Sequence, residues 1–468
     1  MRGLLASSIG VTCAAALALP LAPPATAATV RPASTAETAT AASRATAPTT
    51  ASLPGRTQSL PLTSLTHDRS LGPTGAEQGL TRRGVRPFSL LGVVWDDPGA
   101  ELHGRVQVRT RATATGIWSD WQDVDPHNID HGADPDTPER TSGRVRGATA
   151  PLWVGDSDGV ELRVSPAAGH TEQHANDRTD DVARATRTAP TAAALPSGLH
   201  LELVDPGTTG LTPAHAPVGS PRTRALPATA RTDAAAVVKA AEPAAAAVAA
   251  PAVPAGAKLT KGQRAKPYIG PRPRIVTRGG WSADETLREK GFRYTTTVKA
   301  AFVHHTASGN NYKCAQAPSV IRGIYRYHVV SMGWRDIGYN FLVDKCGNIY
   351  EGRAGGVTKP VLGAHTLGFN SNSMGIAVLG TYTKTKPPAA TVTAIARLTA
   401  WKLGLFGANP SGKTYLKSGG GNLYRKGKNV RLNVISGHRD GFATECPGRQ
   451  LYGKLGSARS AAARLQGR

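Results

Sequence analysis

Aromatic side chains are confined to two stretches of this 468-residue chain, which limits where a hydrophobic core can form. No Phe, Trp or Tyr precedes Phe88, and none lies between Trp153 and Tyr268. Long segments rich in Ala, Pro and Thr that lack aromatic residues bury too little apolar surface to offset chain entropy. Because the chain is also too long for one ordinary core, we expect two folded domains separated by disordered segments.

The first 28 residues have the pattern of a secretory signal peptide. Arg2 supplies a positive charge, an apolar run covers residues 4–22, and Ala25-Thr26-Ala27 is a small-x-small cleavage site. A membrane anchor is the alternative, but Ser, Gly, Thr and Pro interrupt the run. No other stretch is long and apolar enough to span a bilayer. We therefore predict a secreted, extracellular and cell-wall-associated protein without a transmembrane segment.

Composition and patterning divide the rest of the chain. Residues 29–84 are predicted to be a disordered Thr/Ala/Pro-rich arm, 85–206 an all-β domain with a flexible insertion at 165–196, 207–267 a Pro/Ala-rich linker, and 268–468 a second domain.

The all-β prediction rests on short strand-like runs, of which VQVRT and HLELV alternate apolar and polar residues. Gly, Asp and Pro separate the runs, which favours a sandwich or barrel. The acidic run DHGADPDT (130–137) lacks the spacing of a calcium loop, so ordinary turns are the preferred interpretation. The tryptophans of this region could stack on sugars, but core packing is the default.

Strand and helix patterns alternate after Tyr268. Helical periodicity is expected over 318–330 and 389–406, and strands are expected at 299–306, 339–344, 349–353, 374–380 and 433–440. Interleaved strands and helices predict an α/β domain, with a mixed central sheet flanked by helices.

The formal net charge of +24 is compatible with a solvated surface, with nucleic-acid binding or with attraction to an anionic cell envelope. The chain contains no helix-turn-helix, finger or RNA-binding signature, and a secreted protein rarely meets nucleic acid. An anionic cell envelope is therefore the preferred partner. Electrostatic steering of this kind is screened over about 8 Å at physiological salt, so it favours encounter more than specificity.

Two segments of the C-terminal domain carry residues typical of metal chemistry. FVHHTAS places His304 and His305 at the end of a strand, and GHRDGFATECPG contains His438 and Cys446. Three His and Cys ligands with a fourth position open to water describe a catalytic zinc site, whereas a closed structural site needs a fourth protein ligand. Taken alone, each His could be a packed core residue and Cys446 an inert buried thiol.

Four blocks in residues 275–455 resemble the peptidoglycan recognition protein and type 2 N-acetylmuramoyl-L-alanine amidase family. They are FVHHTAS (302–308), DIGYNFLVDKCGNIYEGR (336–353), GAHTLGFNSNSMGIAVLG (363–380) and GHRDGFATECPG (437–448). The N-terminal β region is similar to one that accompanies this amidase in secreted actinobacterial proteins. The resemblance implies that residues 268–468 form a zinc amidase domain of this family.

The resemblance also implies roles for individual residues. The zinc ligands would be His304, His438 and Cys446. Tyr339 would be catalytic, and Thr444 occupies a position where some members carry a catalytic lysine and others a threonine. The residues implied to line the substrate groove are His365 and Asn370, and the residues implied to form a disulfide are Cys314 and Cys346.

The implied reaction is zinc-dependent hydrolysis of the amide between the lactyl group of N-acetylmuramic acid and L-alanine in bacterial peptidoglycan. The alternatives are a non-catalytic peptidoglycan-binding protein and an adhesin-like envelope protein in which the β domain does the main work. We expect the protein to act as a monomer on peptidoglycan, with no nucleic-acid partner.

Overall fold

The computed structural model describes residues 54–65, 77–167, 194–208 and 268–468. The predicted signal peptide, most of the predicted insertion and nearly all of the predicted linker lie outside these residues. In the part of the chain that is described, no helix combines the length and the hydropathy needed to cross a membrane.

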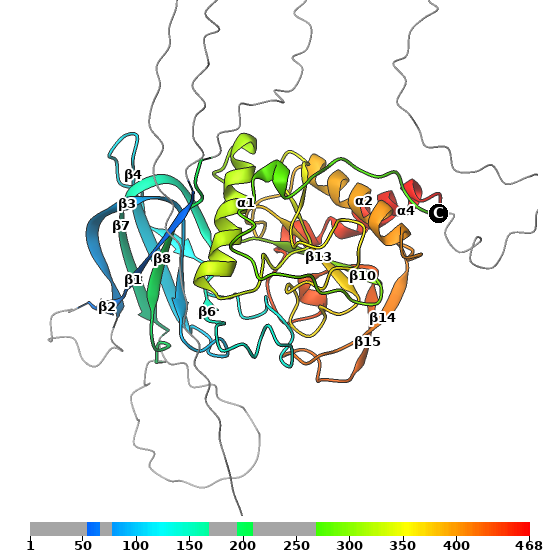
Figure 1. The fold of residues 1–468 in the computed structure, drawn as a ribbon, viewed down its shortest axis with the longest axis horizontal. Helices are drawn as coiled ribbons and strands as arrows, with labels where there is room; N and C mark the ends of the chain where they lie inside the picture. Colours follow the sequence, from blue (N-terminus) through cyan, green and yellow to red (C-terminus); the bar gives the residue numbers. More distant parts are fainter. Residues whose placement is uncertain (1–53, 66–76, 168–193, 209–267) are drawn as a thin grey trace, which may run out of the picture. The chain divides into compact units, whose positions relative to one another are not determined.

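The N-terminal region is an antiparallel sheet, which confirms the all-β prediction (Figure 1). Its main strand order is β1 (Arg56–Pro61), β8 (His200–Asp205), β3 (Gln78–Trp95), β7 (Leu152–Pro166), β4 (Gly104–Ala112) and β5 (Gln122–Val124). Two short strands, β2 (Thr63–Ser64) and β6 (Gly147–Ala148), also pair with β3. Leucine and valine side chains of β3, β4, β7 and β8 form its buried core.

The β region begins earlier than the predicted boundary at residue 85. Strands β1 and β2 and the first part of β3 lie within residues 29–84, which the sequence assigned to a disordered arm. The sequence of β1, RTQSLP, shows no apolar alternation because this strand is held mainly by backbone pairing along β8, from Arg56 opposite Asp205 to Pro61 opposite His200. Backbone pairing leaves no hydrophobic pattern in a sequence.

The C-terminal region contains the predicted mixed sheet. Its order is β16 (Ile435–Gly437), β10 (Ala300–His305), β13 (Ser373–Val378), β11 (Phe341–Val343), β12 (Ile349–Glu351) and β9 (Ile275–Val276). The first four strands are parallel, β12 is antiparallel to β11, and β9 is parallel to β12. A separate hairpin consists of β14 (Lys413–Lys417) and β15 (Asn429–Asn433).

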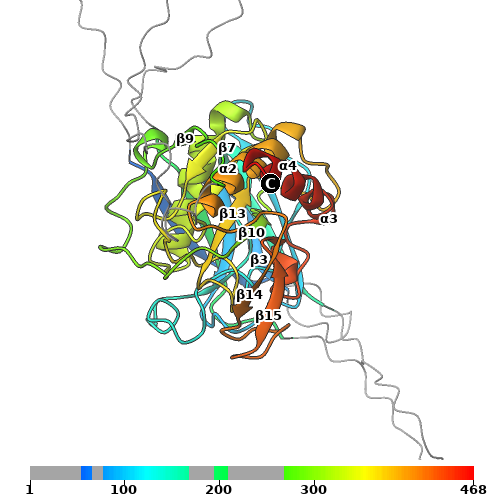
Figure 2. The ribbon, with the colours of Figure 1, turned by 90° about the vertical axis from the view of Figure 1, so that its right-hand side faces the viewer.

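Helices cover both faces of this sheet (Figures 1 and 2). On one face, α2 (Ala389–Gly404) and α4 (Leu455–Leu465) pack against Ala301 and Val303 of β10. On the other face, α1 (Ala317–Arg326) packs against Leu342 and Ala377. Pro318 lies in the first turn of α1, where its missing N–H costs nothing. The short helical segments are η1 (Gly279–Trp281), η2 (Cys314–Gln316), η3 (Tyr327–Ser331), η4 (His438–Asp440) and α3 (Arg449–Tyr452).

The β region and the α/β region share one hydrophobic cluster. Leu90, Trp153 and Val204 of the β sheet belong to the same buried cluster as Ile321 and Ile324 of α1. Burial of apolar surface at roughly 25 cal/mol per Å² makes such a contact a strong link between the two sheets. The described parts of both regions therefore form one packed body.

Candidate metal centre

Strand register brings His304 and His438 together. Strands β10 and β16 are parallel neighbours in which Val303 lies opposite Gly437, so the next residue of each chain segment is a histidine at the same edge of the sheet. The two imidazole rings are 4.4 Å apart between centroids. The carboxyl ends of parallel strands are where open α/β sheets place their ligands.

Cys446 reaches the same place through a short loop after η4. The backbone N–H of Arg439 donates to the carbonyl of Cys446 at 3.0 Å, which closes the loop. The thiol is free and buried, and its Sγ lies 3.8 Å from His304 Nδ1. The structure thus assembles the three residues for which the sequence predicted a ligand role.

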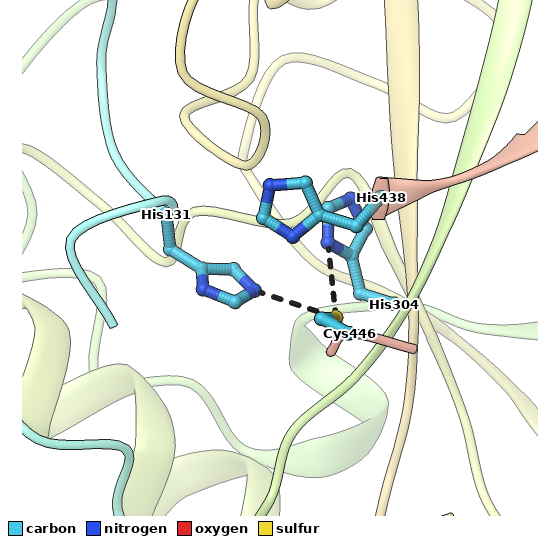
Figure 3. A group of neighbouring side chains, drawn as sticks. All are labelled: His131, His304, His438 and Cys446. Carbon is cyan, nitrogen blue, oxygen red and sulfur yellow. Dashed lines mark hydrogen bonds between the residues drawn. The ribbon is translucent and has the colours of Figure 1, made fainter. Parts of the chain in front are cut away.

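A fourth residue, His131, completes the cluster from the β region. It lies on the β5–β6 loop (residues 125–146), and its Nε2 is 3.9 Å from Cys446 Sγ. One potential ligand atom from each of His131, His304, His438 and Cys446 lies within 4.8 Å of the other three, and all four residues are buried. Figure 3 shows the four side chains converging, with His131 and His304 joined to the sulfur by dashed lines.

Each imidazole is held by its second nitrogen. Asp130 accepts from His131 Nδ1 through Oδ1 at 2.9 Å and from His438 Nε2 through its backbone carbonyl at 3.1 Å. His304 Nε2 lies 3.3 Å from both His365 Nδ1 and Thr366 Oγ1. A hydrogen bond at one ring nitrogen fixes the tautomer and directs the lone pair of the other nitrogen toward a metal.

The residues fit a zinc ion. His438 Nδ1 is buried and has no hydrogen-bond partner, which is costly unless it binds a ligand. Burial lowers the pKa of His438 to about 3 and that of His304 well below its ordinary value, so both rings are neutral at pH 7. Burial and then the charge of Asp130 raise the pKa of the Cys446 thiol. A coordinating metal ion removes the proton from a thiol of this kind.

Tyr339 lies beside the cluster. Its ring centroid is 5.5 Å from that of His304 and 5.8 Å from that of His131. Burial, with the neighbouring Cys446 and Asp130, raises the pKa of Tyr339 well above its ordinary value, so its hydroxyl stays protonated and can donate. Thr444 accepts the backbone N–H of Cys446 at 3.1 Å, a contact that shapes the ligand loop. Catalytic roles for both residues remain predictions.

The predicted groove residues are covered in this structure. His365 lies behind His304 and is fully buried. Asn370 accepts the backbone N–H of His365 at 2.7 Å, and its amide donates to Gly132 O at 2.8 Å and to Asp134 Oδ1 at 2.7 Å. The β5–β6 loop therefore occupies the surface where Asn370 was expected to meet substrate, whereas His365 is buried among residues of the α/β region. The substrate role of both residues stays a prediction.

The cysteines pair as the family resemblance implied. Cys314 and Cys346 form a disulfide, which leaves Cys446 as the free thiol. His305, which follows His304 in β10, points to the other face of the strand and accepts the backbone N–H of Tyr382 at 3.2 Å. This agrees with the alternation of side chains along a strand.

Sequence reasoning missed His131 and Asp130. Both lie in the run 130–137, which was interpreted as ordinary turns, and His131 precedes Cys446 by 315 residues. Turns are present there, but the same residues also bind the α/β region. The one local signal was an Asp beside a His, the pair that orients metal-binding imidazoles. That signal is too common to identify a site without the fold.

Two family models match the chain. Residues 294–449 match the N-acetylmuramoyl-L-alanine amidase family, and residues 32–193 match a family described as Rv3811 N-terminal galactose-binding domain-like. The second match agrees with the early start of the β region.

Relatives match the C-terminal region. Peptidoglycan-recognition protein SC2 of Drosophila melanogaster is 34% identical over 183 residues, which are 39% of this chain and 84% of that protein. The SC2 protein of Drosophila simulans is 31% identical over the same shares. A crystal structure of peptidoglycan recognition protein LE with tracheal cytotoxin, a monomeric diaminopimelic acid-type peptidoglycan, is 32% identical, covers 39% of this chain and 92% of that chain, and has a TM-score of 0.31. Because this chain is more than 30% identical to these two SC2 proteins and covers 84% of each, it belongs to the peptidoglycan recognition protein and type 2 N-acetylmuramoyl-L-alanine amidase family.

Proposed function

We propose that this chain is a secreted, zinc-dependent N-acetylmuramoyl-L-alanine amidase. Its substrate would be bacterial peptidoglycan, in which it hydrolyses the amide between the lactyl group of N-acetylmuramic acid and L-alanine. The observation that carries the proposal is the cluster of His304, His438 and Cys446, which retains all three ligand positions that the family resemblance implies.

The residues around the cluster have the chemistry that amide hydrolysis needs. A bound zinc ion would polarise the amide carbonyl and lower the pKa of the attacking water. Tyr339, protonated and beside His304, would donate a hydrogen bond to the oxyanion that develops on the carbonyl oxygen. The Thr444 hydroxyl would keep Cys446 in place by accepting the backbone N–H of Cys446. The net charge of +24 would favour encounter with an anionic envelope.

A non-catalytic peptidoglycan-binding protein is the second candidate. Its support is the fourth protein residue at the cluster, because four protein ligands are the pattern of structural zinc sites. The burial of His365 and Asn370 points the same way, since a covered groove offers substrate no access to the cluster.

Mass spectrometry of digested peptidoglycan separates the two candidates. The full chain and His131→Ala, which keeps the other three ligands, are each incubated with purified wall and zinc. New L-alanine amino termini and free lactyl groups, absent with Cys446→Ser and absent after chelation, are the expected result for the amidase. Reducing sugar ends would indicate a glycosidase instead. Wall binding by both proteins without any new amino termini would support the non-catalytic candidate.

A further inference from the structure

We infer that the β5–β6 loop is an internal plug that keeps the metal centre latent, with His131 as the fourth protein ligand. The inference rests on the proposed function, because a plug can keep the metal centre latent only if the open centre has the proposed amidase activity. It concerns residues of the β region that lie outside the four blocks on which the family resemblance depends.

The tip of the loop is bound to the α/β region on both sides of His131. The backbone carbonyl of Asp130 accepts from Leu367 N at 3.0 Å as well as from His438. Asp134 Oδ1 accepts from Gly368 N at 2.8 Å and from the Asn370 amide. These contacts cover residues 367–370, which include Asn370 of the predicted substrate groove.

A buried ion pair fixes the middle of the loop. The carboxylate of Glu139 accepts from both terminal nitrogens of Arg353 at 2.8 and 2.9 Å, and from the backbone N–H of Arg335 at 3.3 Å. Burial lowers the pKa of Arg353, but the carboxylates of Glu139 and Asp336 together raise that pKa above its ordinary value. Removing one partner of such a pair leaves an uncompensated buried charge, so Glu139 is a strong anchor.

The tip of the loop is attached by polar contacts, unlike the two sheets, which share an apolar cluster that also includes Val145 at the end of the loop. In the loop itself the buried apolar side chains are Ala133 and Val145. Residues 130–134, the tip around His131, are held by hydrogen bonds, each of which contributes little net stability because water replaces it on opening. The buried Glu139–Arg353 pair lies outside this tip. We therefore expect the tip, with His131, to leave the metal centre while β3 and α1 stay packed.

Coordination number decides between an active and a closed centre. With His131 Nε2 in place the cluster has four protein ligands, and without it three remain, which is the number found in catalytic zinc sites. With a metal bound, opening would exchange the His131 imidazole for a solvent molecule. This exchange would require no electron transfer or covalent chemistry.

Cobalt substitution tests this inference without relying on activity. The full chain, His131→Ala and the matched control His127→Ala are loaded with Co²⁺ and titrated with azide. His127 lies on the same loop and is exposed. Azide should leave the visible spectrum of the wild type and of His127→Ala unchanged, and should shift that of His131→Ala. An equal azide shift in the wild type, or identical cobalt spectra without azide in the wild type and His131→Ala, would overturn the inference.

A second variant covers the case in which His131→Ala does not fold. Glu139→Ala removes an anchor of the loop but no metal ligand, and Asp136→Ala removes an exposed loop carboxylate that pairs with Lys426. The azide shift and faster extraction of cobalt by a chelator should appear in Glu139→Ala and not in Asp136→Ala. The same low extraction rate in both variants would contradict a loop that opens.

The wall-digestion assay separates this inference from the proposed function. Faster release of L-alanine amino termini by His131→Ala than by the wild type supports both. Equal release rates from the two proteins would show that the loop does not inhibit. If neither protein releases amino termini but azide still distinguishes them, the closed centre stands and the amidase proposal fails.

Discussion

Asp130 contacts two imidazoles of the candidate metal centre with two different atoms. Its carboxylate holds His131 and its backbone carbonyl holds His438. One residue of the β region thus positions a ligand that the α/β region supplies. Because a substitution changes the side chain and keeps the carbonyl, the two contacts can be separated by experiment.

Asp130→Ala should weaken zinc binding without abolishing it. His131 loses the acceptor that fixes its tautomer, while His438 keeps its carbonyl partner. Loss of such an outer contact typically costs roughly 10–100-fold in metal affinity. Competition with a chromophoric chelator measures the change, and Asp136→Ala is the control on the same loop. An affinity equal to that of the control would show that Asp130 does not orient a ligand.

His328 should make the fold sensitive to acid. It is buried, accepts Gly338 N–H at 3.2 Å through Nδ1, and burial lowers its pKa from 6.5 to about 3. Between these values the unfolded chain binds a proton that the folded chain does not. The stability that comes from the neutral ring is therefore complete above pH 6.5 and is lost as the pH falls toward 3.

His328→Asn tests this effect because an amide oxygen can still accept the Gly338 N–H. Between about pH 6.5 and pH 4 the wild type should lose stability faster than the variant, by up to about 1.4 kcal/mol per pH unit. Urea unfolding at several pH values measures the difference in slope. Equal slopes would mean that His328 takes up its proton in the folded state.

Residue types indicated metal chemistry, and the family resemblance implied His304, His438 and Cys446 as the ligands; the structure brings these residues together. The same reasoning could not find His131. A ligand that arrives from another domain leaves no spacing to recognise, and its sequence, DHGADPDT, has the composition of a surface turn. The contact of Asn370 with the β5–β6 loop was equally hidden, because it depends on which loop packs there.

At the scale of elements, strand existence was easier to predict than strand partners. The runs at 299–306 and 374–380 were predicted as strands and appear as β10 and β13. The pairing of β10 with β16 joins segments far apart in the sequence, and this pairing sets His304 beside His438. Edge strand β1 escaped prediction because backbone pairing needs no apolar pattern.

Gly92 of β3 packs so closely against Tyr327 of η3 that one added methyl group would clash with the tyrosine. A Cβ added at Gly92 would lie 2.3 Å from Tyr327 Oη, whose hydroxyl lies 3.2 Å from Thr149 O and 3.3 Å from Val93 O. Gly92→Ala should destabilise the protein by about 1–3 kcal/mol through overpacking. Gly84→Ala, in the same strand with no neighbour closer than 3.7 Å, is the control. Equal urea midpoints for the two variants would contradict a close-packed interface.

The two folded regions that the sequence predicted are packed against each other in the whole molecule. The sequence showed two aromatic-rich regions and a linker between them, and nothing in it marked their contact surface. That surface consists of ordinary core residues such as Leu90 and Ile321, which look the same whether they face their own domain or another. The metal cluster adds a second link, since His131 comes from one region and the other three residues from the other.

Zinc removal should therefore affect both regions together. If one ion is held by residues of both, its binding free energy stabilises the packed body as a unit, by about 2.7 kcal/mol at a free zinc concentration 100 times Kd. Thermal unfolding of the zinc-loaded chain should give one transition, and chelation should lower its midpoint without splitting it.

Hydrogen exchange followed by mass spectrometry should show residues 125–146 and 438–446 losing protection together on chelation, and both should regain it when zinc is restored. Protection that falls in 438–446 alone would mean that the β5–β6 loop is held by its polar contacts and not by the ion. In His131→Ala the two segments should uncouple, because the remaining three ligands all belong to the α/β region.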